Sequence, residues 1–207
     1  MPLISSRLRK ASASSGTSNG FLNPGSLKDG QSVRFALLTE DAFDFYQFWV
    51  KEKDGEGRKP IRCIDEPSPE DVDQLIAEAN ERYDNEYMRP LTKDGKGKEP
   101  IKPAAAIAVY NFETGSVQIF DWYQSTITQA LDELSQMEDY ADSMTDIDLV
   151  LKRTGQGMDT RYGLNAVPRK KGSTASIEAA WEDAQAKGFD IERLIGGGNP
   201  FEDSSDD

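Results

Sequence analysis

The sequence predicts a mainly β fold with flanking helices (α+β), built around a small antiparallel barrel. Seven short segments alternate apolar and polar residues, and six of them form three pairs that flank turns rich in glycine. The predicted strands are 33–38, 45–53, 58–64, 104–110, 116–122, 147–153 and 158–164. Strands joined by short turns pair antiparallel. Several such pairs in one chain favour a small barrel or an α+β domain over a parallel α/β fold.

Three amphipathic helices are predicted between and after the hairpins. The first begins at Ser68-Pro69-Glu70-Asp71, where an N-cap serine precedes a proline and two acids. The second spans 125–138, and the third spans 176–187 before Gly188, a residue that commonly ends helices.

The chain is expected to have four parts. Residues 1–24 are predicted to be a disordered basic arm, 25–171 the core, 172–195 a C-terminal helix, and 196–207 a flexible acidic tail that begins with Gly196-Gly197-Gly198 as a hinge. The chain shows neither a signal-peptide pattern nor a long apolar run. We therefore expect a cytoplasmic protein with no membrane contact, in the host cytoplasm if a phage encodes it.

The amino-acid composition excludes several kinds of site. With one cysteine, Cys63, and no histidine, the chain cannot form an internal disulfide or use an imidazole base. A zinc site of Cys and His ligands is not expected either. We therefore predict no catalytic residues, no metal, no cofactor and no enzymatic activity.

Charge is segregated along the chain. The net charge is -13, which by itself argues against binding to phosphate. Yet residues 65–86 hold nine acids and one base, and residues 121–148 hold eight acids and no base. The bases gather in 51–62, 89–102 and 149–171. The distribution therefore allows a basic binding surface on an acidic protein.

The first hairpin carries the first candidate binding surface. Strand alternation places Trp49 on the face opposite to Tyr46, Phe48 and Val50. The predicted nucleic-acid contacts on the Trp49 side are Trp49, Lys51, Lys53, Arg58 and Arg62. A tryptophan among cations suits stacking on any base while the cations follow the phosphates. The alternative is that Trp49 packs under a neighbouring loop.

The other two hairpins carry the remaining candidates. The third hairpin places Lys152, Arg153, Arg161 and Tyr162 around the turn Gly155-Gln156-Gly157. In the second, Gln118, Phe120 and Trp122 share one face of a strand. That face is either a further binding surface through Phe120 or the surface that the helix from Ser125 covers.

Three segments resemble phage single-stranded-DNA-binding proteins of the T-even helix-destabilising type and their cyanophage and podovirus relatives. They are Lys152-Arg153-Thr154-Gly155-Gln156-Gly157-Met158-Asp159-Thr160-Arg161-Tyr162, Leu27-Lys28-Asp29-Gly30-Gln31-Ser32-Val33-Arg34-Phe35 and Val117-Gln118-Ile119-Phe120. The resemblance implies an OB-fold-like core (residues 25–171) that binds single-stranded DNA in phage replication, recombination and repair. The T-even members hold zinc with Cys and His ligands, which this chain lacks.

The two ends of the chain fit the same resemblance. The family's basic N-terminal arm gives cooperative self-association on DNA, and the similar residues here are Arg7, Arg9, Lys10, Ser12 and Ser14. An acidic tail implies recruitment of replication or recombination proteins, through Phe201, Glu202, Asp203, Asp206 and Asp207. A tethered polyanion would also compete with DNA for the basic surface, so deletion of 196–207 is expected to tighten DNA binding.

Two other functions compete with this interpretation. The net charge of -13 also suits an acidic adaptor or DNA mimic that binds a host or phage enzyme. A metal-dependent nuclease would use Asp121, Asp146 and Asp148, because carboxylates can hold magnesium. The nuclease is the least favoured of these functions, because its acids lie in a segment without a basic residue.

Overall fold

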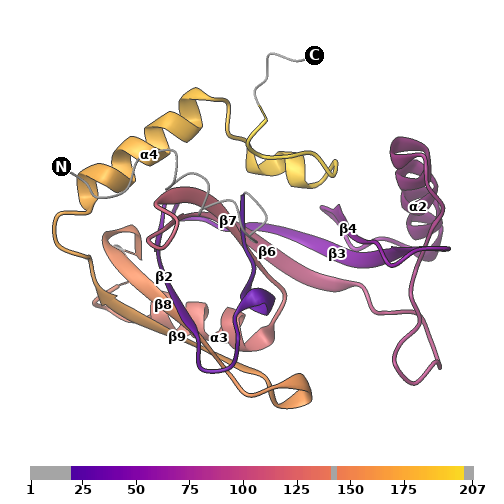
Figure 1. Ribbon diagram of the computed structural model, residues 1–207, viewed down its shortest axis with the longest axis horizontal. Coiled ribbons are helices and arrows are strands. Elements are labelled where there is room, and N and C mark those ends of the chain that lie inside the picture. Colours follow the sequence, from indigo (N-terminus) through magenta and orange to yellow (C-terminus); the bar gives the residue numbers. More distant parts are fainter. Residues whose placement is uncertain (1–19, 141–143, 203–207) are drawn as a thin grey trace, which may run out of the picture. The chain divides into compact units, whose positions relative to one another are not determined.

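The computed structural model describes residues 20–140 and 144–202 (Figure 1). The chain forms two compact units. Unit 1 comprises Met1–Asp41 and Ile107–Ala184, and unit 2 comprises Ala42–Ala106 and Gln185–Asp207. Strand β6 (Lys102–Asn111) contributes its first half to unit 2 and its second half to unit 1. The described chain is mainly β and has three α-helices, as the sequence predicts.

Unit 1 contains an open, mixed sheet in the order β1-β7-β6-β2-β8-β9. Strand β1 runs parallel to β7, whereas β2 pairs antiparallel with β6 and β8, and β8 pairs antiparallel with β9. Within residues 20–140 and 144–202 no pairing joins the outer strands β1 and β9, so the sheet is not closed into the predicted barrel. The strand bounds are Phe21–Leu22 (β1), Ser32–Leu37 (β2), Ser116–Trp122 (β7), Ile147–Thr154 (β8) and Arg161–Pro168 (β9).

Aromatic side chains fill the core of unit 1. The ring of Phe120 lies 5.0 Å from that of Phe35 and stacks on Trp122 at 5.1 Å between centroids. Helix α3 (Ser125–Ser135) adds the buried Ile127, and its Thr128 Oγ1 accepts a hydrogen bond of 3.2 Å from the Trp122 indole. The acidic second helix therefore buries its apolar stripe against the sheet and exposes its charged side.

Helix α4 (Thr174–Ala186) docks on unit 1 through its first three turns. Ile177 is buried with Ala36 and Tyr110, and Ala180 packs at the edge of that cluster. The connection from β9 to α4 is fixed by a buried carboxylate, Asp148, whose side chain is fully inaccessible.

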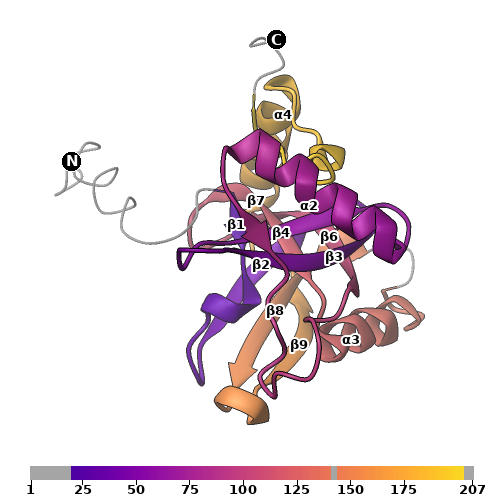
Figure 2. The same cartoon turned by 90° about the vertical axis from the view of Figure 1, so that its right-hand side faces the viewer.

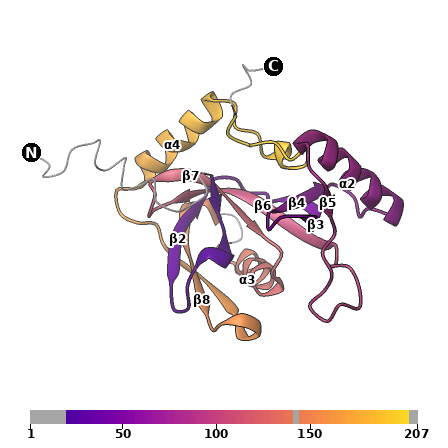
Figure 3. The same ribbon diagram turned by 45° about the vertical axis from the view of Figure 1, so that its right-hand side comes forward.

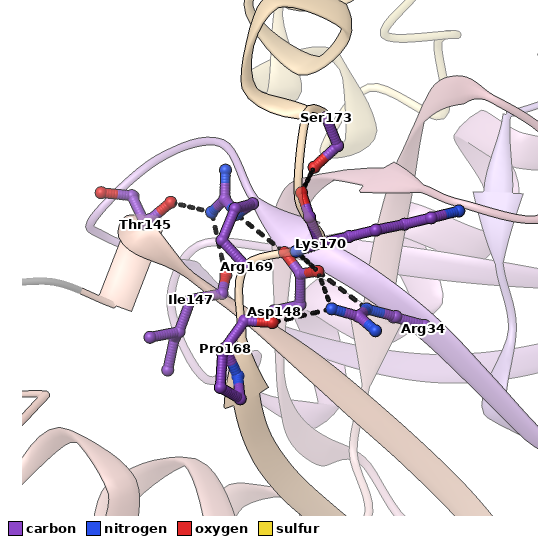
Figure 4. Close-up of polar contacts among 8 residues, drawn as sticks. All are labelled: Arg34, Thr145, Ile147, Asp148, Pro168, Arg169, Lys170 and Ser173. Carbon is purple, nitrogen blue, oxygen red and sulfur yellow. Dashed lines mark hydrogen bonds and ion pairs between the residues drawn. The ribbon is translucent and has the colours of Figure 1, made fainter.

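Asp148 lies between two arginines (Figure 4). Arg34 Nε donates to Asp148 Oδ2 at 2.7 Å, and Arg169 Nε lies 2.8 Å from Oδ1. The backbone N–H of Lys170 donates to Oδ2 at 3.0 Å, and Arg34 also donates to the carbonyl of Pro168 at 2.8 Å. These bonds satisfy a charge that would be costly to bury alone. They tie the end of β9 to β2 and β8.

Unit 2 consists of a small sheet with a helix on one face. Strand β3 pairs antiparallel with β4, with β5 and with the first half of β6. The turn between β3 and β4 closes through the Glu52 N–H, which donates to the Gly57 carbonyl at 2.9 Å. The element bounds are Phe43–Glu52 (β3), Arg58–Cys63 (β4), Tyr87–Met88 (β5) and Pro69–Tyr83 (α2).

Helix α2 lies along β3 and β4 (Figure 2). It begins with the predicted capping box, in which Ser68 Oγ accepts from the Asp71 N–H and the Asp71 carboxylate accepts from the Ser68 N–H. The ionised carboxylate is a stronger acceptor than the neutral acid, so these hydrogen bonds lower the pKa of Asp71. Val72 packs with Phe48 and Val50 of β3, so α2 covers the face of the hairpin that the sequence assigned to the core.

Residues 189–202 of unit 2 form a folded turn. The Gly198 N–H donates to the Arg193 carbonyl at 2.9 Å, and Gly197 adopts a φ of 70° that suits glycine. Leu194 is buried, and the Asp190 N–H donates to the Pro200 carbonyl at 3.0 Å. In the structure the three glycines predicted to be a hinge are therefore part of a hydrogen-bonded turn. The remaining tail residues, 203–207, lie outside the described residues.

The helices within the described ranges do not combine the length and apolarity that crossing a bilayer requires.

Candidate nucleic-acid interface

The face of the β3–β4 hairpin opposite to α2 is the candidate surface of unit 2. Register pairs Trp49 with Pro60 and Lys51 with Arg58, so these four side chains share one face. Trp49 and Lys51 are half-buried, and Arg58 is exposed. Because α2 packs on the alternate residues Phe48 and Val50, this face remains accessible within unit 2.

Arg58 lies over the indole of Trp49, with its guanidinium carbon 5.6 Å from the ring centroid. Such cation–π contacts at exposed sites contribute about 0.5–1 kcal/mol. Arg58 also pairs with Glu99 at 2.5 Å. The pair holds a cation beside a partly open aromatic ring, the arrangement that base stacking with phosphate binding needs.

Two other predicted residues of this hairpin are already engaged. Lys53 pairs with Glu86 at 2.6 Å, and this hydrogen bond raises the pKa of Lys53 and lowers that of Glu86. Exposed pairs of this kind are weak, so Lys53 can exchange Glu86 for phosphate at little cost. Arg62 differs: it is only 9% exposed and lies over the Phe45 ring at 5.5 Å. Arg62 therefore packs in the fold rather than on the predicted surface.

The β8–β9 hairpin of unit 1 carries a separate candidate surface. Its turn is clasped by the segment before β2: Asp29 Oδ1 accepts from the Gly155 N–H at 2.8 Å, and the Gly30 N–H donates to the Arg153 carbonyl at 2.9 Å. Two of the three segments that carry the family resemblance, 27–35 and 152–162, therefore lie together although they are far apart in sequence. A Cβ at Gly155 would lie 2.3 Å from the Asp159 carbonyl oxygen, so this tight turn requires glycine.

Arg153 serves this clasp rather than an open surface. Its Nη1 donates to the carbonyls of Gly25 and Leu27 at 3.0 and 2.7 Å, and its Nη2 donates to Thr160 Oγ1 at 3.4 Å. Arg153 was predicted to contact nucleic acid. In the structure its hydrogen bonds stabilise the turn.

The accessible residues of this hairpin are Lys152, Arg161 and Tyr162. The two cations are exposed on opposite strands, and Tyr162 is half-buried. Partial burial raises the pKa of the Tyr162 phenol, so this group is neutral near pH 7. Met158 at the tip is 92% exposed. In Figure 1 this tip is the orange turn that joins β8 to β9.

Phe120 does not lie on a surface. It is fully buried between Phe35 and Trp122, and Gln118 on the same side of β7 is also buried, where its Oε1 accepts from Asn111 at 2.8 Å. Of the two alternatives for this strand face, the structure has the covered one. The prediction that Phe120 contacts DNA is corrected accordingly: the ring is part of the core.

The three acids of the nuclease hypothesis are not equivalent. Asp146 is exposed, Asp121 is half-buried, and both oxygens of Asp148 face arginines. A metal ion at Asp148 would have to displace Arg34 and Arg169. Across residues 20–140 and 144–202, no three His, Cys, Asp or Glu side chains gather closely enough to bind a metal.

Of the predicted tail residues, the structure describes Phe201 and Glu202. Phe201 packs on Phe189 with 5.2 Å between ring centroids, and the Glu202 carbonyl accepts from Arg193 at 2.6 Å. Asp203, Asp206 and Asp207 lie outside the described residues, as do the arm residues Arg7, Arg9, Lys10, Ser12 and Ser14. A truncation that tests the tail should therefore keep the chain through Glu202, because removal from residue 196 would take away the buried Pro200.

The basic segment 89–102 of unit 2 forms a hairpin between β5 and β6, which was not among the predicted elements. Residues 89–102 carry five bases and two acids, and Pro90 and Pro100 flank the turn Thr92-Lys93-Asp94-Gly95. Glycine, proline and aspartate at these positions are a local turn signal that could have revealed it.

Comparison of the chain with protein-family models, with curated proteins and with solved structures finds no match in any of the three.

Proposed function

We propose that this protein binds single-stranded DNA without sequence preference, as a non-enzymatic component of phage DNA replication, recombination and repair. The observation that carries the proposal is Trp49. Its indole is only half-buried, Arg58 lies over it, and Lys51 stands beside it on a face that α2 does not cover. A base stacked on such a ring gains roughly 1–3 kcal/mol whatever its identity.

The placement of charge makes this proposal compatible with a net charge of -13. The acids of α2, including Glu70, Asp73 and Glu78, are exposed on a helix that packs on the opposite face of the β3–β4 hairpin. Repulsion between phosphates and these carboxylates is screened beyond about 10 Å at 0.1 M salt. The cations of the Trp49 face can therefore attract the phosphates of a bound DNA strand with little repulsion from the α2 carboxylates.

The OB-fold interpretation of the core belongs to this proposal. What supports it is a mixed sheet made largely of antiparallel hairpins, with candidate contacts on hairpin turns and strand faces. Recruitment of replication partners by the acidic tail and self-association through the basic arm are likewise proposed from the sequence.

The direct test is a fluorescence titration of the full chain with oligo-dT and with a duplex of equal length, at 50 and 200 mM salt. We expect saturable quenching by oligo-dT, weaker binding of the duplex, and an affinity that falls with salt by a log–log slope of about 0.7 per phosphate contact. Absence of binding to oligo-dT at 50 mM salt, by fluorescence and by gel mobility, would contradict the proposal.

The β8–β9 hairpin supplies a separate prediction. Replacing Lys152 and Arg161 together by glutamine should weaken oligo-dT binding and lower the salt slope by about 1.4, because two phosphate contacts are lost. The matched control replaces Glu178 and Glu182 of α4, both exposed, by glutamine. If the control and the cationic pair lower the slope equally, the hairpin is not a phosphate contact.

An acidic adaptor is the second candidate, and one feature favours it. A hollow of about 350 Å³ beside the start of α2 is lined by Ile64, which is 52% exposed, and by four acids. The acids are Asp65, Glu66, Asp71 and Glu78. This surface suits a basic partner segment with an apolar side chain. Failure of the oligo-dT titration would favour this function.

A further inference from the structure

The hairpin formed by residues 89–102 is an ordered projection of unit 2. The Thr92 N–H donates to the Gly97 carbonyl at 2.8 Å, and the Glu99 N–H donates to the Pro90 carbonyl at 2.8 Å. The turn is further closed by Thr92 Oγ1, which donates to Asp94 Oδ1 at 2.6 Å. In Figure 3 it is the pink loop that extends away from α2 between β5 and β6. The side chains on this loop therefore have a defined scaffold.

The two acids of the hairpin are engaged in local contacts. Asp94 accepts from Thr92 Oγ1 and from the Lys96 N–H, and these bonds lower the pKa of Asp94. Glu99 pairs with Arg58 of β4 at 2.5 Å.

The lysines, in contrast, extend into solvent. Lys93, Lys96 and Lys98 are exposed, and the Lys98 ammonium donates to the Arg89 carbonyl at 3.4 Å. Lys93 and Lys96 flank the turn glycine Gly95, and Lys98 lies on the stem, bridged to Leu91. Three flexible ammonium groups on a short hairpin are point charges suited to phosphates.

The hairpin is physically connected to the Trp49 face. Arg89 donates to the Glu99 carbonyl at 2.5 Å, the Glu99 carboxylate pairs with Arg58, and the Arg58 guanidinium carbon lies 5.6 Å from the Trp49 ring centroid. All of these residues belong to unit 2. The hairpin 89–102 is therefore the basic element next to a DNA strand whose base stacks on Trp49.

We propose that the hairpin 89–102 binds the phosphates of single-stranded DNA, with Lys93, Lys96 and Lys98 as its contacts. This inference rests on the proposed function and extends it to residues that neither the strand pattern nor the family resemblance indicates. Leu91, which is 58% exposed, adds an apolar surface to this hairpin that a sugar or a nucleobase could contact.

The test compares two triple variants in the full chain. Lys93→Gln/Lys96→Gln/Lys98→Gln removes three charges, and Lys93→Arg/Lys96→Arg/Lys98→Arg retains them. The glutamine variant is expected to lower the salt slope of oligo-dT binding by about 2, so the advantage of the wild type shrinks about 20-fold between 50 and 200 mM salt. The arginine variant is expected to keep the wild-type slope. All three lysines are exposed, so both variants should unfold at the wild-type temperature.

The outcomes separate this inference from the proposed function. If the wild type binds oligo-dT and the glutamine variant has the same affinity and slope, the hairpin inference is wrong and the proposed function stands. If the glutamine and arginine variants lose affinity equally, the charge is not the cause and the inference is again wrong. If the wild type does not bind oligo-dT, the proposed function fails and the inference fails with it.

Discussion

Replacing Asp148 by asparagine is expected to lower the free energy of unfolding by about 3–5 kcal/mol, the usual cost of removing one partner from a buried ion pair. The asparagine would occupy the same space but leave the charges of Arg34 and Arg169 uncompensated. The side chain of Arg169 is only 17% exposed, and that of Arg34 is 34% exposed, so water can replace the carboxylate only in part. Urea unfolding followed by circular dichroism measures this loss.

The control for this substitution is Asp146→Asn. Asp146 is two residues away and exposed, and its replacement should change the free energy of unfolding by less than about 0.5 kcal/mol. If Asp148→Asn stays within about 1 kcal/mol of the wild type, the two arginines do not depend on this carboxylate. A typical domain is stable by only about 5–15 kcal/mol, so the expected loss is a substantial fraction of the whole and easily measured.

The helices and hairpins were predictable because their signals are local. The capping box at Ser68 fixes the start of α2, and the expected helices at 125–138 and 176–187 correspond to α3 and α4 within a few residues. The turn at 54–57 joins β3 and β4 as expected. In each case the decisive residues lie within one turn of the feature they determine.

The site residues were harder to predict because burial depends on distant segments. Phe45 and Trp49 lie on the same side of β3, yet Phe45 is 2% exposed and Trp49 is half-buried. Arg153 is bound by carbonyls of residues 25 and 27, more than 120 positions away. Strand alternation gives the side of a residue but not what covers that side.

Asp148 illustrates the same limit for charge. In the sequence it is one of eight acids in a stretch without bases, which indicates a solvated surface or a metal ligand. In the structure it is fully buried, because Arg34 and Arg169 come to it from other segments. An acid-rich segment can therefore hide a structural counter-ion for arginines elsewhere in the chain.

The second large effect is expected from Trp49→Ala, which should weaken oligo-dT binding about 5- to 150-fold, since one stacked base contributes roughly 1–3 kcal/mol. Fluorescence polarisation of a labelled oligonucleotide measures this without relying on tryptophan emission. Trp49→Phe is the matched control: it should retain most of the affinity, because a phenyl ring still stacks, but lose the Trp49 contribution to quenching. Wild-type affinity in Trp49→Ala would remove the observation on which the proposed function rests.

The salt dependence of the Trp49 variant distinguishes stacking from phosphate binding. Trp49→Ala removes no charge, and Arg58 remains held by Glu99 at 2.5 Å. The log–log salt slope should therefore stay at the wild-type value while the affinity falls at every salt concentration. The lysine hairpin should behave in the opposite way, with a lower slope and a loss of affinity that is greatest at low salt. A Trp49→Ala variant with a reduced slope would mean that the indole acts by positioning Arg58 rather than by stacking on a base.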